Sequence, residues 1–302
     1  MKDIGSIIDI LETVDMFFKY KDIRVYFMGN ILLKETTALV QNCLGSDLES
    51  ITVERAVFGL FFSGVKLSNG MGGLCFTPVK EIPAAVCCPS SAKAMPLSGR
   101  LKGRSAADYL SDLDHSNILR KTLAIATLNA LSAACWQSGA AKGYQLQTGV
   151  DAFDHVQIPQ GGKSVVVGAL VPILKRLIAA EADFKVLEMD NRTLKGKELE
   201  HYACPEDASS YIPEADLLVI TGVTVLNDTL PDLLNMIKPG AQVIVTGPTA
   251  SMLPDAFFQH GVTTMGGVLV TKPDEVLDII SEGGSGYHFF GKSAERLIIN
   301  KN

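Results

Sequence analysis

The chain has 302 residues, of which 47% are hydrophobic and 20% charged, and its formal net charge is -6. This balance permits a large buried core and excludes a disordered chain. The charges are spread along the sequence without basic blocks, whereas a nucleic-acid groove needs clustered lysine and arginine. We therefore expect no nucleic-acid partner, and the length favours two domains.

No run of about 18 consecutive apolar residues occurs, so no membrane span is expected. Near the N-terminus, the acidic residues Asp9, Glu12 and Asp15 interrupt an amphipathic segment and are unlike a secretory signal. The six cysteines have irregular spacing, which does not indicate a disulfide framework. Together these features predict a cytoplasmic protein.

Residues 1–104 predict a small α+β domain. Valine, phenylalanine and glycine are frequent between turn-forming residues, a pattern typical of a small antiparallel sheet. We expect a helix over 7–18 and strands at Ile23–Met28, Thr36–Val40, Val53–Val65 and Gly73–Phe76. The segment 98–103 has the composition of a linker.

Residues 105–302 predict a doubly wound parallel sheet, because strand and helix patterns alternate as in βαβ units. Ser105 and Asp108 form a helix-capping pattern, and a long helix rich in alanine is expected from Ser116 to Trp136. Expected strands are Ser164–Gly168, Phe184–Met189, Asp216–Gly222, Gln242–Gly247 and a pair of short strands within 263–270. Expected helices are Val171–Ala180, Leu230–Ile237, Pro254–His260 and Pro273–Ile280.

The stretch Asn191–Ala215 is long and polar and contains no convincing strand. If the chain crosses there to the other side of the first strand, the topological switch point lies between Ser164–Gly168 and Asp216–Gly222. Ligands of such sheets bind beyond the carboxyl ends of the strands near this point.

Two of the predicted strands end in the same dipeptide, Thr-Gly, at 221–222 and at 246–247. Because these ends meet at one edge of a parallel sheet, we expect them to form the floor of a binding site. The residues expected at this edge are Gly168, Glu188, Thr221, Gly222, Gly247, Pro248, Thr249 and Gly267.

Several candidate residues have two interpretations. Glu188 could accept hydrogen bonds from ribose hydroxyls or be a solvated carboxylate at a strand end. Asn227 and Thr229 could bind an anion, or they could satisfy the free N–H groups of the next helix, with Thr229 as its N-cap. Asn129 lies in the long helix and could contact a ligand, although a buried amide more often bonds to the backbone.

The first βα turn contains the single glycine Gly168, whereas a dinucleotide fingerprint needs three. This counts against ordinary NAD binding. No arrangement of nucleophile and base is recognisable, so the catalytic residues and the cofactor are not predicted.

Metal ligation by cysteine and histidine has weak support. His201 and Cys204 have a spacing that fits one helical face, and Cys87 and Cys88 are adjacent, but no second cluster accompanies either pair. A buried or incidental role is favoured for these residues. His288 lies in the glycine-rich segment 283–291, which could be a lid or a surface loop.

Six short motifs, taken in order and spacing, resemble the prokaryotic family named "putative heavy-metal chelation" over roughly residues 105–290. They are Ala126-Thr-Leu-Asn129-Ala130, Val-Leu-Glu188, Thr221-Gly222, Asn227-x-Thr229, Gly247-Pro248-Thr249 and Phe258-x-x-Gly261-Val-x-x-Met-Gly266-Gly267. The preceding part, which includes Gly72 and Gly73, resembles the companion domain, similar to the N-terminal domain of enolases. The resemblance implies a Rossmann-like second domain, a site in the cleft between the domains, and a role that concerns metals or a small metal-chelating molecule.

A second resemblance links residues 215–245 to 2-hydroxyacid dehydrogenases, but the glycine fingerprint and a matching catalytic histidine are missing. The hypothesis is therefore a small polar or anionic ligand in the cleft, oriented by Glu188 and Asn227, with the Gly72-Gly73 turn closing from the first domain. Hydroxyl, amide and glycine groups suit a polar organic ligand better than a soft metal ion.

Three classes of function stay open. The protein could be an enzyme acting on a metal-chelating metabolite, a binding protein for such a molecule or its metal, or a nicotinamide or S-adenosylmethionine enzyme with a degenerate dinucleotide site. Whether it is an enzyme, and whether it forms a homo-oligomer, is left open by the sequence.

Overall fold

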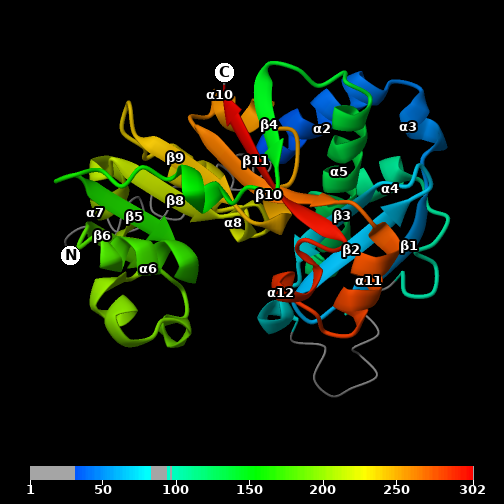
Figure 1. The fold of residues 1–302 in the computed structure, drawn as a ribbon. Coiled ribbons are helices and arrows are strands. Elements are labelled where there is room, and N and C mark those ends of the chain that lie inside the picture. The colour runs from blue at the N-terminus through cyan, green and yellow to red at the C-terminus, as the bar shows by residue number, and fades with distance from the viewer. Residues whose placement is uncertain (1–30, 83–93, 96, 302) are drawn as a thin grey trace, which may run out of the picture.

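The computed structural model describes residues 31–82, 94–95 and 97–301. The predicted helix over 7–18, the predicted strand Ile23–Met28, and Cys87 with Cys88 lie outside the described residues. The described chain forms a large, mostly parallel sheet beside a small antiparallel sheet, as Figure 1 shows.

The small sheet has the strand order β1-β2-β3 and is antiparallel throughout. The run predicted as one strand over 53–65 is a hairpin, because the chain turns at Gly59, whose N–H donates to the carbonyl of Phe62 at 3.0 Å. The three strands are β1 (Val53–Phe58), β2 (Phe62–Leu67) and β3 (Gly72–Phe76).

The strand predicted at Thr36–Val40 is wrong, because these residues belong to helix α2 (Ile31–Leu44). Threonine and valine favour strands by local preference. Burial overrides that preference here, since one face of the segment is apolar at the spacing of a helix. The buried residues are Leu32, Leu33, Thr36 and Val40.

The large sheet has the strand order β4-β11-β10-β9-β8-β5-β6-β7. Strands β5 to β10 are parallel, whereas β11 and β4 are antiparallel to their neighbours. Since β5 lies between β6 and β8, the switch point falls where the sequence predicted it. The strands are β4 (Tyr144–Thr148), β5 (Lys163–Val167), β6 (Asp183–Leu187), β7 (Tyr202–Ala203), β8 (Leu217–Thr221), β9 (Gln242–Thr246), β10 (Thr264–Val270) and β11 (Ala294–Lys301).

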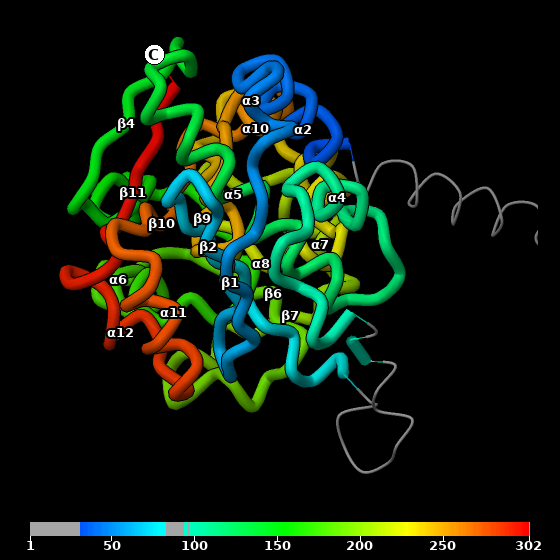
Figure 2. The backbone as a smooth tube through the Cα atoms, turned by 90° about the vertical axis from the view of Figure 1, so that its right-hand side faces the viewer, coloured from blue at the N-terminus to red at the C-terminus, as the bar shows by residue number. Residues whose placement is uncertain are grey.

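Four features of this sheet differ from the prediction. The two-residue strand β7 lies in the stretch 191–215, where no strand was expected, and β10 is one continuous strand rather than a short pair. Strands β4 and β11 were not predicted. Figures 1 and 2 both show them side by side at one edge of the sheet, with the C-terminus at the end of β11.

Helices cover both faces of the large sheet, as expected for a doubly wound fold. In β8, Leu217 and Val219 pack in one cluster with Leu174 of α6, while Leu218 and Ile220 join the cluster of the opposite face. The helices are α5 (Ile118–Gln137), α6 (Val171–Ala179), α8 (Val223–Leu226), α9 (Leu230–Leu234), α10 (Asp255–Gln259) and α11 (Pro273–Ser281).

The shorter helices occupy the connections. The predicted cap at Ser105 is confirmed, because its side chain accepts a hydrogen bond from the N–H of Asp108 at 3.1 Å, at the start of α4. These helices are α3 (Asp47–Ser50), α4 (Ala106–Leu110), α7 (Ala208–Tyr211) and α12 (Gly286–Phe289).

The small sheet lies between α5 and α11, two helices that follow residue 104 in the chain. Helix α5 packs on β2 and β3, and α11 packs on β1 and β2. A single apolar cluster runs from α2 through the small sheet and α5 to the large sheet. Within the described ranges, α5 alone is long and apolar enough to span a membrane, and 89% of it is buried as a core helix.

Candidate functional site

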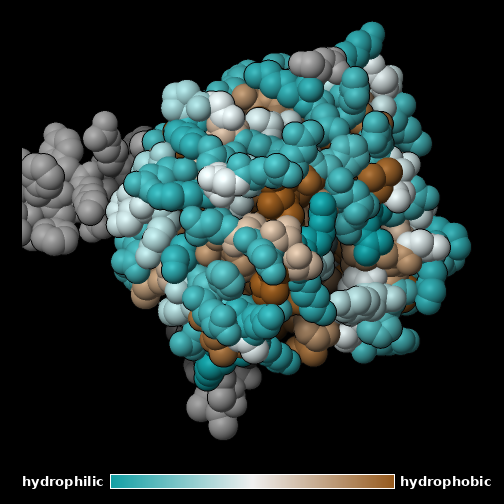
Figure 3. Space-filling view, turned by 60° about the vertical axis from the view of Figure 1, so that its left-hand side comes forward, coloured by the Kyte–Doolittle hydropathy of each residue, from teal (hydrophilic) through white to brown (hydrophobic). Residues whose placement is uncertain are grey.

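A cavity of about 410 Å³ lies between the large sheet and the small sheet. Its floor comes from the end of β9 and the middle of β10, and its walls come from β11, the start of β2, the end of β3 and the α12 segment. Figure 3 shows a hollow in one face of the molecule, with hydrophobic side chains around it in a mostly hydrophilic surface. Residues that line the cavity include Phe61, Phe62, Phe76, Asp151, Phe153, Thr246, Gly247, Pro248, Gly266, Gly267, Tyr287, Phe290 and Arg296.

The floor of the cavity is bare backbone that glycines bring close to neighbouring chain. Gly247 has a φ of +130°, which favours glycine, and its N–H donates to the carbonyl of Gly266 at 2.9 Å. A Cβ at Gly266 would lie 2.5 Å from Thr246 Oγ1. Glycine is therefore required both after the end of β9 and within β10, where the Thr246 side chain packs against the main chain.

Ser251 and Asn129 fix the short 3₁₀ helix Pro248–Ala250 beneath the cavity. Ser251 Oγ donates to the carbonyl of Pro248 at 2.8 Å and accepts from the N–H of Val268 at 2.8 Å. Asn129 is 2% exposed, and its Nδ2 lies within hydrogen-bond distance of the carbonyls of Leu74 at 2.8 Å and of Pro248 and Thr249, both at 3.1 Å. The amide of Asn129 therefore joins β3 to the floor.

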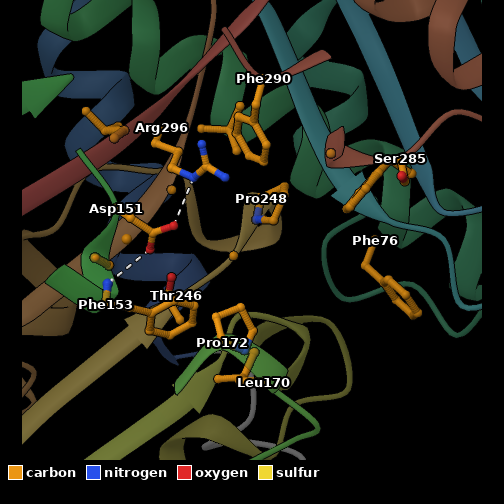
Figure 4. Close-up of a pocket in the computed structure, with 18 of the residues that line it drawn as sticks. Phe76, Asp151, Phe153, Leu170, Pro172, Thr246, Pro248, Ser285, Phe290 and Arg296 are labelled. Carbon is orange, nitrogen blue, oxygen red and sulfur yellow. Dashed lines mark hydrogen bonds and ion pairs between the residues drawn. The ribbon is translucent and has the colours of Figure 1, made fainter. Parts of the chain in front are cut away.

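Arg296 and Asp151 are the charged residues of the cavity wall. Arg296 Nε lies 2.9 Å from Asp151 Oδ2, and its guanidinium carbon lies 4.4 Å from the ring centroid of Phe290. The N–H of Phe153 holds the other oxygen of Asp151 at 3.0 Å. Figure 4 shows the guanidinium between Phe290 and Asp151, extending toward Pro248.

Five of the sequence-predicted residues lie at the cavity or directly support it. Gly247, Pro248 and Gly267 line the cavity. Thr249 lies directly below it, where its side-chain oxygen accepts a hydrogen bond from the N–H of Phe76 at 3.0 Å. Gly222 supports the floor, since its N–H donates to the carbonyl of Thr246 at 2.6 Å.

Gly168, Glu188 and Thr221 lie together at the first βα turn instead. The Glu188 carboxylate accepts hydrogen bonds from the N–H of Ala169 at 2.8 Å and from the N–H of Asp190 at 2.9 Å. Gly168 has a φ of +94°, and a Cβ there would lie 2.8 Å from Thr221 Cγ2. Both oxygens of Glu188 are thus used within the fold.

Asn227 and Thr229 lie outside the cavity, in the turn between α8 and α9. Thr229 occupies the N-cap position of α9, as predicted, but its Oγ1 donates to Asn227 Oδ1 at 2.7 Å and makes no capping hydrogen bond. The local turn competes with the cap, because the intervening Asp228 has a φ of +61° and pairs with Lys121 Nζ at 2.5 Å.

Gly72 and Gly73 were predicted as a turn that closes over the site, and this is wrong because they are strand residues of β3. They serve close packing. A Cβ at Gly73 would lie 2.1 Å from the carbonyl oxygen of Ala126 in α5, and one at Gly72 would lie 2.7 Å from Val270 Cγ1.

Donors for a metal ion do not converge in the described part of the chain, which contains no group of three or more His, Cys, Asp or Glu placed to hold one. The ring of His201 stacks on Phe184 at 3.8 Å, a packing role. The segment 283–291 does border the cavity through Tyr287 and Phe290, whereas His288 Nδ1 accepts from the N–H of Ser285 at 3.0 Å. Whether this segment moves as a lid stays a prediction.

Sequence reasoning missed Asp151, Arg296 and the aromatic walls. Arg296 lies on β11, which was not predicted, and Asp151 lies in the connection before β5. The short apolar run Leu297-Ile298-Ile299 is the pattern that could have indicated a strand there.

Comparison with known proteins identifies the family. A family model described as "Putative heavy-metal chelation" matches residues 151–299, and a second model with the same description matches residues 41–132. An uncharacterized protein of Methanocaldococcus jannaschii is 27% identical over 273 residues, which cover 88% of this chain and 97% of that protein.

Two crystal structures of proteins of unknown function share the fold. The protein from Pyrococcus horikoshii has a TM-score of 0.69 and 19% identity, with 89% of this chain and 100% of that chain covered. The protein from Desulfitobacterium hafniense has a TM-score of 0.66 and 18% identity, with 89% and 99% covered. With its two family matches spanning both sheets, the chain belongs to the family described as "putative heavy-metal chelation".

Proposed function

We propose that the protein binds a small organic anion in the cavity between its two sheets, with the Arg296 guanidinium as the anion-binding group. The observation that carries this proposal is the way Arg296 is held. Asp151 engages its Nε edge and Phe290 covers one face, while its two terminal nitrogens make no hydrogen bond within the described residues. A guanidinium fixed in this way offers a two-pronged donor to a carboxylate or phosphate.

The floor of the cavity suits such a ligand. Gly247, Gly266 and Gly267 line the cavity, so part of its floor is main chain that carries no side chain. Thr246 adds a hydroxyl. A volume of about 410 Å³ is within the range of small-molecule sites in proteins.

Direct coordination of a heavy metal fits this cavity poorly. Among the described residues that line it, Asp151 is the one carboxylate and there is no cysteine or histidine, whereas soft metals prefer thiolate and imidazole ligands. The Asp151 carboxylate is already paired with Arg296. We therefore place the link to metals in the ligand, as an organic molecule that chelates them.

A nicotinamide or S-adenosylmethionine enzyme is the weaker alternative. The first βα turn would have to receive the cofactor, but the Ala169 N–H there already bonds to Glu188, and Gly168 packs against Thr221. A pyrophosphate needs free N–H groups at this position.

Thermal stability and calorimetry with defined probes test the proposal. We expect benzoate, citrate or another small organic acid to raise the melting temperature, since a ligand at 100 times its Kd adds about 2.7 kcal/mol of stability. Arg296→Gln should weaken the binding of that acid by about 10-fold to 100-fold, the value of a charge-assisted hydrogen bond.

Arg55→Gln is the matched control, because Arg55 also pairs with a single carboxylate, Asp278 at 2.7 Å, but lies outside the cavity. It should leave the affinity for the acid unchanged. Stabilisation by zinc or copper ions alone, equal in the wild type and in Arg296→Gln, would contradict the proposal.

A further inference from the structure

The walls of the cavity are unusually aromatic. Six of its 20 lining residues are phenylalanine or tyrosine, whereas aromatic residues make up 7% of the whole chain. The six are Phe61, Phe62, Phe76, Phe153, Tyr287 and Phe290. A purely polar anion would gain little from aromatic walls, so the walls indicate the chemistry of the uncharged part of the ligand.

The aromatic residues come from different sides of the cavity. Phe62 and Phe76 belong to the small sheet, Phe153 follows Asp151 beside the large sheet, and Phe290 follows α12. Figure 4 shows Phe153 and Phe76 on opposite sides of Pro248. Aromatic residues therefore flank the cavity from two sides, and we call the space between them the slot.

In one wall, the aromatic rings and the Arg296 guanidinium contact one another in series. The ring of Phe62 meets buried Phe289 edge-on at 5.7 Å, Phe289 meets Phe290 at 4.9 Å, and Phe290 carries the guanidinium of Arg296 at 4.4 Å. Each ring is fixed by the next, so the wall keeps its shape without a ligand.

The rings also remain partly uncovered. Phe62, Phe76, Phe153 and Phe290 are half-buried, and Tyr287 at the rim is 96% exposed. Exposed aromatic surface gathered around one hollow marks a binding site, because covering it removes apolar area from water.

Building on the proposed function, we infer that the ligand is an aromatic carboxylate: a flat ring system bearing one anionic group. The ring lies in the slot between the aromatic walls, and the carboxylate meets the terminal nitrogens of Arg296. The same guanidinium that binds the anion is stacked on Phe290, so the charge and the flat surface are presented side by side.

Isothermal titration calorimetry of the full chain with four probes separates the charge from the ring. Benzoate has both, cyclohexanecarboxylate has the charge and a puckered ring, benzamide has the ring without the charge, and acetate has the charge alone. We expect benzoate to bind about threefold to tenfold more tightly than cyclohexanecarboxylate, which is the value of one aromatic pair. Acetate and benzamide should bind at least about tenfold more weakly than benzoate.

Variants test the wall directly. Phe153→Leu keeps an apolar side chain. It should lower the ratio of benzoate affinity to cyclohexanecarboxylate affinity toward one, while the affinity for cyclohexanecarboxylate itself changes little. Phe258→Leu is the control, since Phe258 is a buried aromatic residue outside the cavity. Its ring centroid lies 6.4 Å from that of Tyr144, in an edge-on pair. This variant should reduce stability but leave the ratio intact, because the ratio is measured within each variant.

Two kinds of failure are distinguishable. Equal binding of benzoate and cyclohexanecarboxylate, both lost in Arg296→Gln, would overturn the aromatic class and leave the proposed anion site standing. Absence of binding by any carboxylate, or binding that Arg296→Gln does not change, would overturn the proposed function itself.

Discussion

The first βα turn and the β9–β10 floor are the two places where this sheet could hold a ligand, and they are built in opposite ways. At the first turn, the carboxylate of Glu188 satisfies the N–H groups of Ala169 and Asp190. At the floor, Gly247, Gly266 and Gly267 line the cavity, and the two terminal nitrogens of Arg296 beside it make no hydrogen bond within the described residues. The backbone donors of the first turn are thus occupied by a side chain of the protein, whereas the terminal nitrogens of Arg296 beside the floor have no partner within the described residues.

This difference shows how a doubly wound sheet can move its site. Ligands usually bind at the switch point, which here lies between β5 and β8. Glu188 fills the donors at that point, while the small sheet and the antiparallel strand β11 supply walls two and more strands away. In the function we propose, the site therefore lies where the two sheets meet.

Asn129→Ala tests the floor region and should have the largest effect of the variants. Its Nδ2 serves the carbonyls of Leu74, Pro248 and Thr249, and it is buried, so we expect a loss of about 3 kcal/mol in the free energy of unfolding. Because the floor then loses the Asn129 link to β3, although the bond between the Phe76 N–H and Thr249 remains, benzoate binding should weaken as well. Urea denaturation and calorimetry measure the two effects.

Asn191→Ala is its control, since Asn191 is exposed and lies far from the floor in sequence and structure. Its effect should stay within about 0.5 kcal/mol. A stable Asn129→Ala protein with normal benzoate affinity would mean that β3 does not position the floor.

Glu188→Ala tests the other region and should separate stability from binding. The change leaves two N–H groups without their carboxylate, and since the site is half-buried we expect a loss of about 2 kcal/mol. Benzoate affinity should not change, because Glu188 is not part of the cavity lining. Exposed Glu200→Ala is the control in urea denaturation. Loss of benzoate binding with unchanged stability would return the ligand to the first turn.

Much of the fold could be predicted from local pattern. The apolar runs of β5, β6, β8 and β9 are buried on both faces, so they read clearly as parallel strands, and the switch point followed from their order. Strand β11 was missed because its ends are polar and its apolar residues are few. The segment at Thr36–Val40 was misassigned because local preference and burial pointed to different structures.

The candidate site was harder to predict, because it joins distant parts of the chain. Gly247 follows the end of β9, which the sequence shows, whereas Gly267 was predicted in a strand-end turn and lies within β10. Arg296 and Asp151 are 145 positions apart in the chain and meet only through the pairing of β11 with β10 and β4. No local pattern records that one arginine will be held by one aspartate and one phenylalanine.

Cys75 provides the smallest expected effect and bears on the family's link to metals. It lies on β3 directly before Phe76, so it is the cysteine nearest to the cavity lining among the described residues in sequence. Burial raises the pKa of its thiol to about 12, and Thr249 opposes this only in part. Because a soft metal binds the thiolate, this residue should be unreactive at pH 8.

Thiol labelling followed by peptide mapping should therefore modify exposed Cys204 when no metal is added, and should leave Cys75 unmodified with or without mercuric or cuprous ions. Cys75→Ala should likewise leave benzoate affinity unchanged. Rapid labelling of Cys75, slowed by one of these metals, would give the protein a metal ligand of its own at the cavity. The expected result would agree with our proposal that the metal-binding donors belong to an organic anion, for which the cavity offers an arginine and aromatic rings.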